Sequence, residues 1–297
     1  MRKWLCLLLL LAGWIAVGRL IFGSQPHGEY EIGRTQDPQR IISLAPDLTE
    51  ILFALGLEDR IVGVTLDSDY PPAAKTKKKV GTFWQPNIEA IIAAKPDLVI
   101  TLGFEQQTNV AARLNRIGYN CLTLNIDTIE DFFKAVAVIG TATGKQQQAA
   151  KLTGEIKRQI SEVAATTTSG YRARVLWVVQ REPLRVAGRN TFINEMIELA
   201  GGQNAIGLTL HKYPPIGGEQ VIACKADVII EPTMTPEHAA LQREQAHQYW
   251  SRYRSLPAVS AGRICIIDGD IVCRLGPRLG EGVRAIAGYL RPELFTD

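Results

Sequence analysis

Aromatic and arginine side chains in a few short loops are the residues of this sequence best suited to bind a ligand. Tyr70 lies in "SDYPP" and Trp84 in "FWQPN", each after an expected strand and beside prolines that stiffen the loop. Arg274 and Arg278 lie in "CRLGPR". Aromatic rings offer flat apolar faces, and a guanidinium donates several hydrogen bonds in a fixed fork. These residue types favour non-covalent binding.

The motifs of common enzymes are missing. "GPRLGEG" follows an expected strand and precedes an expected helix, as a nucleotide loop would. It lacks the Gly-x-Gly-x-x-Gly spacing of dinucleotide sites and the lysine of a P-loop. No Gly-x-Ser-x-Gly occurs, no histidine has the context of a catalytic triad, and Asp67 and Asp69 lie in an ordinary turn. We therefore expect a binding protein and not an enzyme.

A metal site is not expected either. The chain has four histidines: His27 lies near the N-terminus, and His238 and His247 lie nine residues apart on a polar stretch. A first-row metal needs several converging histidines and carboxylates. No Cys-x-x-Cys occurs, so a zinc or thioredoxin-type site has no support. The sequence predicts no resident cofactor.

One helix-to-strand unit occurs twice. The segment "NIEAIIAAKPDLVI" (87–100) aligns without a gap with "GGEQVIACKADVII" (217–230), at a constant offset of 130 residues. The alignment matches Glu89 with Glu219 near the start of each unit. A second pair of segments, "TEILFALG" and "NEMIELAG", also aligns without a gap and matches Glu50 with Glu195. The chain therefore has two similar halves.

Strands and helices alternate through the first half. "RIISLAP" and "RIVGVT" are typical of strands, and "DLTEILFALGL" between them has apolar residues at helical spacing. The pairs "NIEAIIAA"/"DLVITL" and "TNVAARLNRIG"/"CLTLNI" continue the pattern. Such alternation indicates an α/β fold with a parallel sheet covered by helices.

A long helix is expected between the halves. The 24 residues "KQQQAAKLTGEIKRQISEVAATTT" contain no proline and carry one narrow apolar stripe. At ~1.5 Å per residue they span roughly 36 Å, which suits a rigid strut. We predict an N-terminal α/β lobe over 40–143, a linking helix over 144–168 and a C-terminal α/β lobe over 169–297. A ligand cleft is expected between the two lobes.

The segment "ICIIDGDIVC" is interpreted as a hairpin-like pair of strands. A turn at Gly269 would place Cys265 opposite Cys273. An exported protein can form disulfides, so both a bridge and two unpaired thiols remain open.

The N-terminus indicates export. "MRK" precedes 14 apolar residues, "WLCLLLLLAGWIAV", as in a signal peptide over 1–24. The alternative is an uncleaved anchor over 4–22, close to the ~20 residues that span a bilayer. A polar connector follows over 25–39. The net charge of +3 is too small to indicate a nucleic-acid partner. The expected location is the periplasm or the outer face of the cytoplasmic membrane.

A set of motifs in fixed order carries a family resemblance. "ISLAPDLTE", "SDYPP", "FWQPNIEAIIAAKPDLVI", the linking helix, "PPIGGEQVIACKADVII" and "DGDIVCRLGPR" occur in this order over about 40–295. The order resembles that of the helix-linked (class III) periplasmic substrate-binding proteins of ABC importers. Within this class it is most similar to the cobalamin-binding type. The resemblance implies a corrinoid as the transported small-molecule ligand. It also implies a monomer that docks on a permease dimer in the inner membrane.

The resemblance gives the repeated glutamates a role. In the family, one glutamate on the outer face of each lobe pairs with arginines of the two permease subunits, and Glu89 and Glu219 are similar to these. Glu89 lies in the first turn of its helix while Ile88, Ile91 and Ile92 carry the apolar face, so its carboxylate should point outward. The alternative is that both acids only complement a helix dipole, worth roughly 0.3–1 kcal/mol.

The resemblance also implies a set of ligand-binding residues. Aromatic residues at the positions of Tyr70 and Trp84 line the cleft in cobalamin binders, and Phe83 and Gln85 flank Trp84. The second lobe offers the following candidates: Tyr213 in "HKYPP", Leu184 or Arg185 in "PLRVAG", Arg274 and Arg278. Leu275 stands where many relatives have an aromatic residue or proline, so the second wall is expected to be less aromatic.

Three other readings remain open. Haem would need an axial ligand, for which Tyr70, Tyr213 and His211 are available. A ferric siderophore could meet the arginines of the cleft. A membrane-tethered sensor would bind the same ligand without transporting it.

Overall fold

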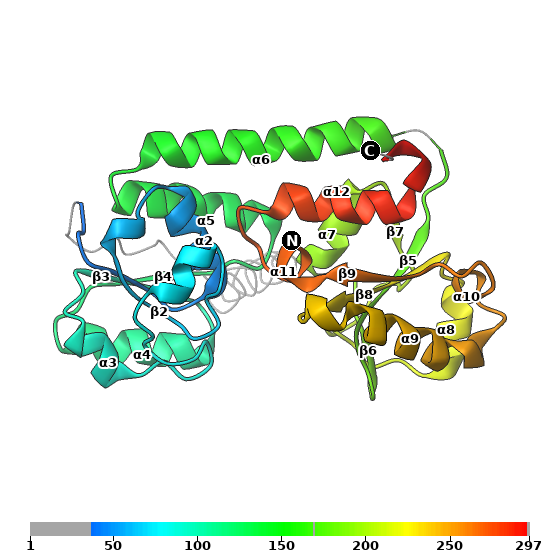
Figure 1. Cartoon of the computed structure of the whole chain (residues 1–297), viewed down its shortest axis with the longest axis horizontal. Coiled ribbons are helices and arrows are strands. Elements are labelled where there is room, and N and C mark those ends of the chain that lie inside the picture. The colour runs from blue at the N-terminus through cyan, green and yellow to red at the C-terminus, as the bar shows by residue number, and fades with distance from the viewer. Residues whose placement is uncertain (1–36, 169, 296–297) are drawn as a thin grey trace, which may run out of the picture. The chain divides into compact units, whose positions relative to one another are not determined.

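Short apolar segments form two parallel-rich sheets, one in each half of the chain (Figure 1). The computed structural model describes residues 37–168 and 170–295. The expected signal peptide or anchor lies outside the described residues, as does nearly all of the connector. Within the described part, no helix is both long enough and apolar enough to cross a membrane.

The sheet of the N-terminal lobe has four strands in the order β2-β1-β3-β4, and all of its pairs are parallel. Its strands are β1 (Ile41–Ser43), β2 (Ile61–Val64), β3 (Leu98–Leu102) and β4 (Cys121–Leu124). Nearly every strand residue is buried, as expected for a parallel sheet covered by helices. Its helices are α2 (Pro46–Ala54), α3 (Ile88–Ala93), α4 (Glu105–Arg116) and α5 (Ile129–Ala142).

The sheet of the C-terminal lobe has five strands. β5 (Arg174–Arg181), β8 (Val228–Thr233) and β9 (Ile264–Asp268) pair in parallel, and β7 (Gln203–Asn204) joins β5 in parallel. β6 (Leu184–Val186) pairs antiparallel with β5. The larger helices of this lobe are α7 (Phe192–Leu199), α8 (Gly218–Cys224), α9 (Ala239–Trp250) and α12 (Leu279–Leu290). Two single-turn helices, α10 (Pro257–Ser260) and α11 (Gly269–Val272), and short 3₁₀ turns complete it.

The helix α6 (Gln146–Thr167) connects the two lobes. It packs against α5 of the first lobe and α12 of the second (Figure 1). Its buried positions Ile156, Ile160 and Val163 form the stripe that the sequence predicted. Each lobe also has its own core, one around Ile42, Val99 and Leu114 and the other around Leu176, Ile229 and Trp250. The predicted two-lobed α/β architecture with one linking helix is confirmed.

The internal repeat is preserved in the backbone. Lys95 and Lys225 both have left-handed φ angles, 47° and 46°, just beyond α3 and α8. Two residues later, the carboxylates of Asp97 and Asp227 accept hydrogen bonds from the N–H groups of Arg40 and Arg174, at 2.9 and 2.7 Å. Each aspartate thus fixes the start of the first strand of its own lobe. The Lys-x-Asp part of the repeat therefore has a structural role.

The predicted hairpin over 264–273 is wrong. β9 pairs in parallel with β8, and residues 269–272 form the helical turn α11. The carboxylate of Asp268 accepts a hydrogen bond from Asp270 N at 2.9 Å, so it caps the turn instead of allowing a second strand. Cys265 and Cys273 are both free thiols, which excludes the bridge between them.

Candidate ligand-binding site

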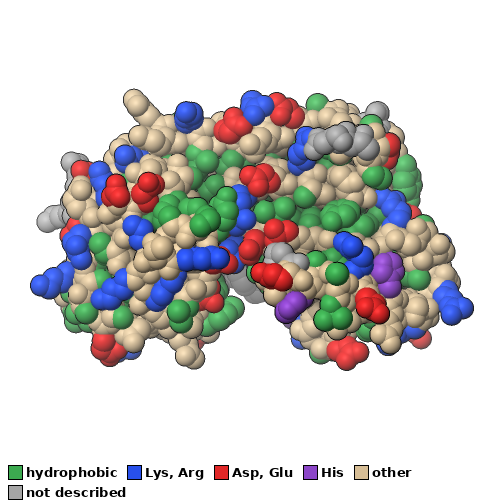
Figure 2. Space-filling model, in the orientation of Figure 1, with side chains coloured by type: hydrophobic (Ala, Val, Ile, Leu, Met, Phe, Trp, Pro, Cys, Tyr) green, Lys and Arg blue, Asp and Glu red, His purple; other side chains and the backbone are tan. Residues whose placement is uncertain are grey.

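A cavity of about 500 Å³ is lined by residues of both lobes, and we call it the interlobe cavity. Figure 2 shows the molecule hollowed between its two halves, with basic and acidic side chains beside the hollow. The lining residues of the first lobe are Pro46, Asp47, Asp67, Phe83, Trp84, Leu102 and Ile126. Those of the second lobe are Phe192, Met234, Cys273, Arg274 and Leu275. Most of this lining is apolar, with charge confined to two aspartates and one arginine.

Three rings of the first lobe form what we call the aromatic wall: Phe83, Trp84 and Phe104. The Phe83 and Trp84 centroids are 4.9 Å apart in an edge-to-face arrangement, and Phe104 lies 5.0 Å from Phe83 and 5.6 Å from Trp84. Trp84 is still 63% exposed. A large apolar side chain held by its neighbours yet open to solvent offers a preformed surface to a ligand.

A buried amide holds the aromatic wall in place. Gln107 is fully buried, and its Nε2 donates to the carbonyls of Leu44 and Phe83 at 2.6 and 3.1 Å. Its Oε1 accepts from Leu102 N at 2.8 Å. In addition, Asp67 Oδ2 accepts from Phe83 N at 2.6 Å. Gln107 thereby ties the segment after β1, the loop of Phe83 and the end of β3 to one another.

Arg274 lies on the cavity wall and bridges the lobes. Its Nη1 lies 3.0 Å from Asp69 Oδ1 and 3.7 Å from Glu50 Oε1, both in the first lobe. Its Nη2 lies 3.0 Å from Asp270 Oδ1, one helical turn away in its own lobe. The side chain is 15% exposed. Arg274 is thus oriented by acids on both sides while it still borders the cavity.

Arg278 makes a second contact between the lobes. Its Nη2 and Nε donate to the two carboxylate oxygens of Glu50 at 2.6 and 3.0 Å. Its guanidinium lies 3.8 Å from the centre of the Tyr70 ring. Burial raises the pKa of Glu50, and the hydrogen bonds from Arg278 oppose that shift. Arg278 and Tyr70 therefore belong to the junction beside the cavity and do not line it.

Asp47 gives the cavity a titratable group. It is half-buried at the start of α2, and its Oδ1 accepts from Leu48 N at 3.0 Å. Burial raises the pKa of this carboxyl to about 6. Glu50 nearby raises the value further, and Arg274 lowers it. The cavity therefore holds a carboxyl that changes charge close to neutral pH.

The other predicted binding residues lie outside the lining. Tyr213 is half-buried, burial raises the pKa of its phenol, and its carbonyl accepts from Arg185 Nη1 at 3.2 Å. Gln85 is exposed beside Trp84. Leu184 is 7% exposed and packs in the core of the second lobe, so the expectation that it faces the cleft is not met. Of the predicted set, Phe83, Trp84 and Arg274 line the interlobe cavity.

The comparisons with known proteins match this two-lobed arrangement. The family model described as periplasmic binding protein matches residues 41–271. The chain belongs to the periplasmic binding protein family. It is a substrate-binding protein of an ABC importer, and not an enzyme, as the sequence predicted.

Three relatives show how far the similarity extends. The substrate-binding lipoprotein YvrC of Bacillus subtilis is 31% identical, over 88% of this chain and 83% of its own length. The vitamin B12-binding protein BtuF of Vibrio cholerae has a crystal structure with a TM-score of 0.75 and 25% identity, covering 88% of this chain and all of that one. A periplasmic heme-binding protein of Pseudomonas aeruginosa has a TM-score of 0.74 and 28% identity, covering 86% and 93%.

The repeated glutamates are exposed on the surface of their lobes. Glu89 and Glu219 are both exposed, each in the first turn of its helix. Neither carboxylate has a hydrogen-bond or ion-pair partner within residues 37–168 and 170–295. Unlike the lysine and aspartate of the same repeat, these acids have no structural contact that explains their recurrence.

Several residues of the interlobe cavity were not found by sequence reasoning. Ile126 and Met234 lie in loops and Phe192 is the first residue of α7, and no periodicity reveals the side-chain direction at such positions. Phe104 lies two residues beyond the end of β3, and its position after a strand was a signal that could have been used. Among the described residues, no group of three or more histidine, cysteine or acidic side chains is arranged to hold a metal.

Proposed function

We propose that this protein captures a corrinoid between its lobes and delivers it to the permease dimer of an ABC importer. The observation that carries the proposal is the interlobe cavity itself. Its lining combines Phe83 and Trp84 of the aromatic wall with apolar side chains and one oriented arginine. A large ring system needs apolar faces on both sides and a few hydrogen-bond donors at its edge.

The relatives support this choice of ligand. The vitamin B12-binding protein of Vibrio cholerae is 26% identical over 85% of this chain and 89% of its own length. BtuF shares the two-lobed fold at a TM-score of 0.75. In the proposed complex, Trp84 and Phe83 contact one face of the corrin ring and Arg274 binds its amide side chains. Leu275, Met234 and Phe192 supply the opposite wall.

Haem is the second candidate, because a heme-binding protein is among the structural relatives at 28% identity. Haem iron would need an axial side chain inside the cavity. Tyr70, Tyr213 and His211 are the residues suited to this, and none of the three lines the interlobe cavity. The face of Tyr70 is in addition covered by Arg278. These positions favour a ligand that needs no axial protein donor.

Delivery is proposed to use Glu89 and Glu219. The two carboxylates are exposed at equivalent positions of the repeat, so they offer matching contacts to two symmetry-related permease subunits. The proposed location is the periplasm or the outer face of the cytoplasmic membrane, with residues 1–24 as signal peptide or anchor.

A ligand panel tests the proposed function. The purified protein is titrated with cobalamin, cobinamide, haem and a ferric siderophore, with tryptophan fluorescence and visible absorbance as readouts. Saturable binding of a corrinoid with one ligand per chain is expected. A shifted Soret band with haem, together with no response to either corrinoid, would overturn the assignment.

A further inference from the structure

Negative charge outweighs positive charge around the interlobe cavity. Arg274 lines the cavity, but Asp69 Oδ1 and Asp270 Oδ1 each lie 3.0 Å from its guanidinium, and Glu50 Oε1 lies 3.7 Å from it. Three acids thus cancel the charge of this one arginine. The carboxylates in or beside the lining are Asp47, Glu50, Asp67, Asp69 and Asp270, and the cations are Lys79, Arg274 and Arg278.

The two other cations near the cavity are occupied as well. Arg278 donates to both carboxylate oxygens of Glu50, at 2.6 and 3.0 Å. Lys79 donates from Nζ to two backbone carbonyls, at 3.0 and 3.2 Å. Burial lowers the pKa of Lys79, and the charges of Asp69 and Asp67 oppose that shift. Neither cation is therefore free to bind an anionic group of a ligand.

Two carboxylates of the lining, by contrast, have no ion-pair partner within the described part of the chain. Asp47 Oδ1 accepts from Leu48 N at 3.0 Å, and Asp67 Oδ2 accepts from Phe83 N at 2.6 Å. Burial raises the pKa of Asp47 to about 6, so this carboxyl is ionised at pH 8. Since a carboxylate accepts several hydrogen bonds, both acids can still accept from a ligand.

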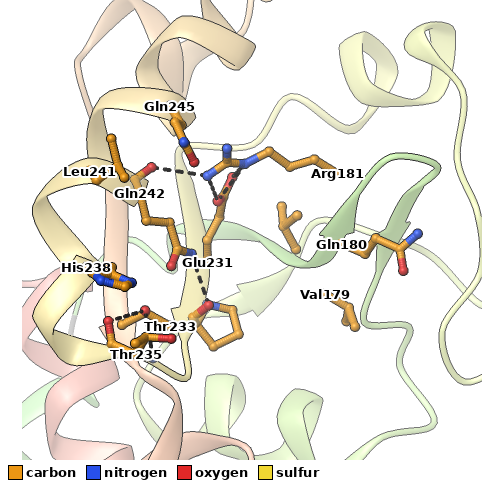
Figure 3. A pocket seen from close by; sticks show the side chains of 12 residues that line it. Val179, Gln180, Arg181, Glu231, Thr233, Thr235, His238, Leu241, Gln242 and Gln245 are labelled. Carbon is orange, nitrogen blue, oxygen red and sulfur yellow. Dashed lines mark hydrogen bonds and ion pairs between the residues drawn. The ribbon is translucent and has the colours of Figure 1, made fainter.

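The excess of acids is a property of this cavity and not of every polar cavity in the protein. A separate cavity in the C-terminal lobe is lined by Arg181 and Glu231, and their charges cancel (Figure 3). Glu231 accepts from Arg181 Nη2 and Nε at 2.7 and 3.0 Å, and the indole N–H of Trp250 donates to its other oxygen at 2.6 Å. The interlobe cavity has no such balance for Asp47 and Asp67.

We propose that the interlobe cavity selects ligands whose side chains are uncharged amides over ligands with anionic side chains, and that Asp47 and Asp67 set this selectivity. The inference rests on the proposed function and narrows its ligand class. The N–H groups of an amide donate to a carboxylate. An anionic side chain instead meets unpaired negative charge in a partly enclosed site, where like charges repel more strongly than in bulk water.

Three corrinoids differ in the anionic groups that they carry. Cobinamide has amide side chains, a cationic cobalt centre and no anionic side chain. Cobalamin has the same ring amides and one phosphate in its nucleotide arm. Cobyrinic acid has carboxylates in place of the amides. The proposal predicts that cobyrinic acid binds most weakly and that the phosphate of cobalamin brings no gain over cobinamide.

Calorimetric titration at pH 8 compares these ligands on matched variants. The wild type should bind cobinamide at least roughly tenfold more tightly than cobyrinic acid, and no more weakly than cobalamin. The double variant Asp47→Asn, Asp67→Asn removes both charges and keeps an amide oxygen for the N–H groups of Leu48 and Phe83. It should reduce the preference for cobinamide over cobyrinic acid at least about threefold. Asp59→Asn, at an exposed acid of the same lobe outside the cavity, is the control and should keep the full preference.

Salt provides a second readout that needs no variant. Dissolved ions screen the repulsion between charges, so raising NaCl from about 20 mM to about 500 mM should narrow the wild-type preference for cobinamide over cobyrinic acid. A preference that does not change with salt would mean that shape and not charge selects the ligand, which overturns the proposal.

The remaining outcomes separate the selectivity from the proposed function. Equal wild-type affinity for cobinamide and cobyrinic acid, or tighter binding of cobalamin than of cobinamide, overturns the selectivity and leaves corrinoid capture standing. A double variant that is folded by circular dichroism and keeps the full preference overturns the role of the two aspartates. No binding of any of the three corrinoids to the wild type overturns the proposed function as well.

Discussion

Glu50 of the first lobe accepts two hydrogen bonds from Arg278 at the start of α12 in the second lobe, at 2.6 and 3.0 Å. A second contact between the lobes, made by a residue of the second lobe, corresponds to this one through the internal repeat. Glu195, the residue that aligns with Glu50, reaches from α7 to accept from Ile129 N at 2.8 Å, at the start of α5 in the first lobe. Two equivalent acids thus cross the junction to opposite helix N-termini, where negative charge is favourable. The lobes are therefore held at the cavity by reciprocal contacts, in addition to α6.

These contacts predict unequal losses of stability. Glu50→Gln should lower the free energy of unfolding by about 3 kcal/mol, because it leaves Arg278 without its buried counter-charge. Glu195→Gln should cost only about 1 kcal/mol, since an amide oxygen still accepts the single bond from Ile129 N. Thermal melting followed by circular dichroism measures both. Equal effects of the two variants would show that the Glu50 pair does not hold the lobes together.

The raised pKa of Asp47 predicts that replacing its carboxyl group stabilises the protein by an amount that depends on pH. The ordinary value is 3.8 and the folded value is about 6, so between these values the folded state binds more protons than the unfolded state. Stability from this group therefore falls as pH rises from 3.8 through 6. Glu50 and Arg274, which face the carboxyl of Asp47, are unchanged in the variant Asp47→Asn. Asp47→Asn should stabilise the protein by roughly 1–2 kcal/mol at pH 7.5, since the side chain is still partly solvated.

The check is a melting series of wild type and Asp47→Asn from pH 4.5 to 8. The difference in melting temperature between the two proteins should shrink steadily toward the acidic end of this range. A difference that is constant over this range would mean that Asp47 does not titrate there.

Gln107 should matter for both stability and binding. Gln107→Leu fills a similar volume but leaves the carbonyls of Leu44 and Phe83 and the N–H of Leu102 without their partner. An unsatisfied buried polar group costs about 1–3 kcal/mol. We expect a lower melting temperature and weaker cobalamin binding, because the aromatic wall loses its support. Unchanged affinity in a destabilised variant would restrict Gln107 to a purely structural role.

Trp84 should be the strongest single contributor to affinity. Trp84→Ala is expected to weaken cobalamin binding by about 10- to 100-fold, a typical effect for an aromatic residue at the centre of an interface. Stability should change little, because the side chain is 63% exposed. Ile117→Ala, an exposed apolar residue beyond α4, is the matched control. Equal affinity of wild type and Trp84→Ala would remove the aromatic wall from the ligand site.

The sequence predicted the elements that depend on local pattern. Strand–helix alternation identified both lobes, the apolar stripe identified α6, and the repeat led to the two exposed glutamates. The hairpin over 264–273 failed because alternation of apolar residues does not reveal that Asp268 caps a helical turn. Export, the ligand and the docking role of the glutamates remain predictions.

The details of the site depend on contacts that the sequence does not encode locally. Arg278 was identified as a ligand residue because its type suits that role. Its partner Glu50 lies 228 residues away in the chain, and only the assembled lobes bring them together. Gln107 had no distinguishing motif, since its importance comes from three backbone groups on separate segments of the chain. The raised pKa of Asp47 likewise results from burial at the junction of elements.

Uptake in a reconstituted importer tests delivery and capture together. Cobalamin affinity and transport into vesicles that contain the permease are measured for the wild type and for the double variant Glu89→Arg, Glu219→Arg. The control is Glu105→Arg, which changes an exposed acid in the first turn of α4. The account predicts unchanged affinity in all three proteins and at least tenfold slower transport in the double variant alone. Normal transport by the double variant, or loss of its cobalamin affinity, would contradict it.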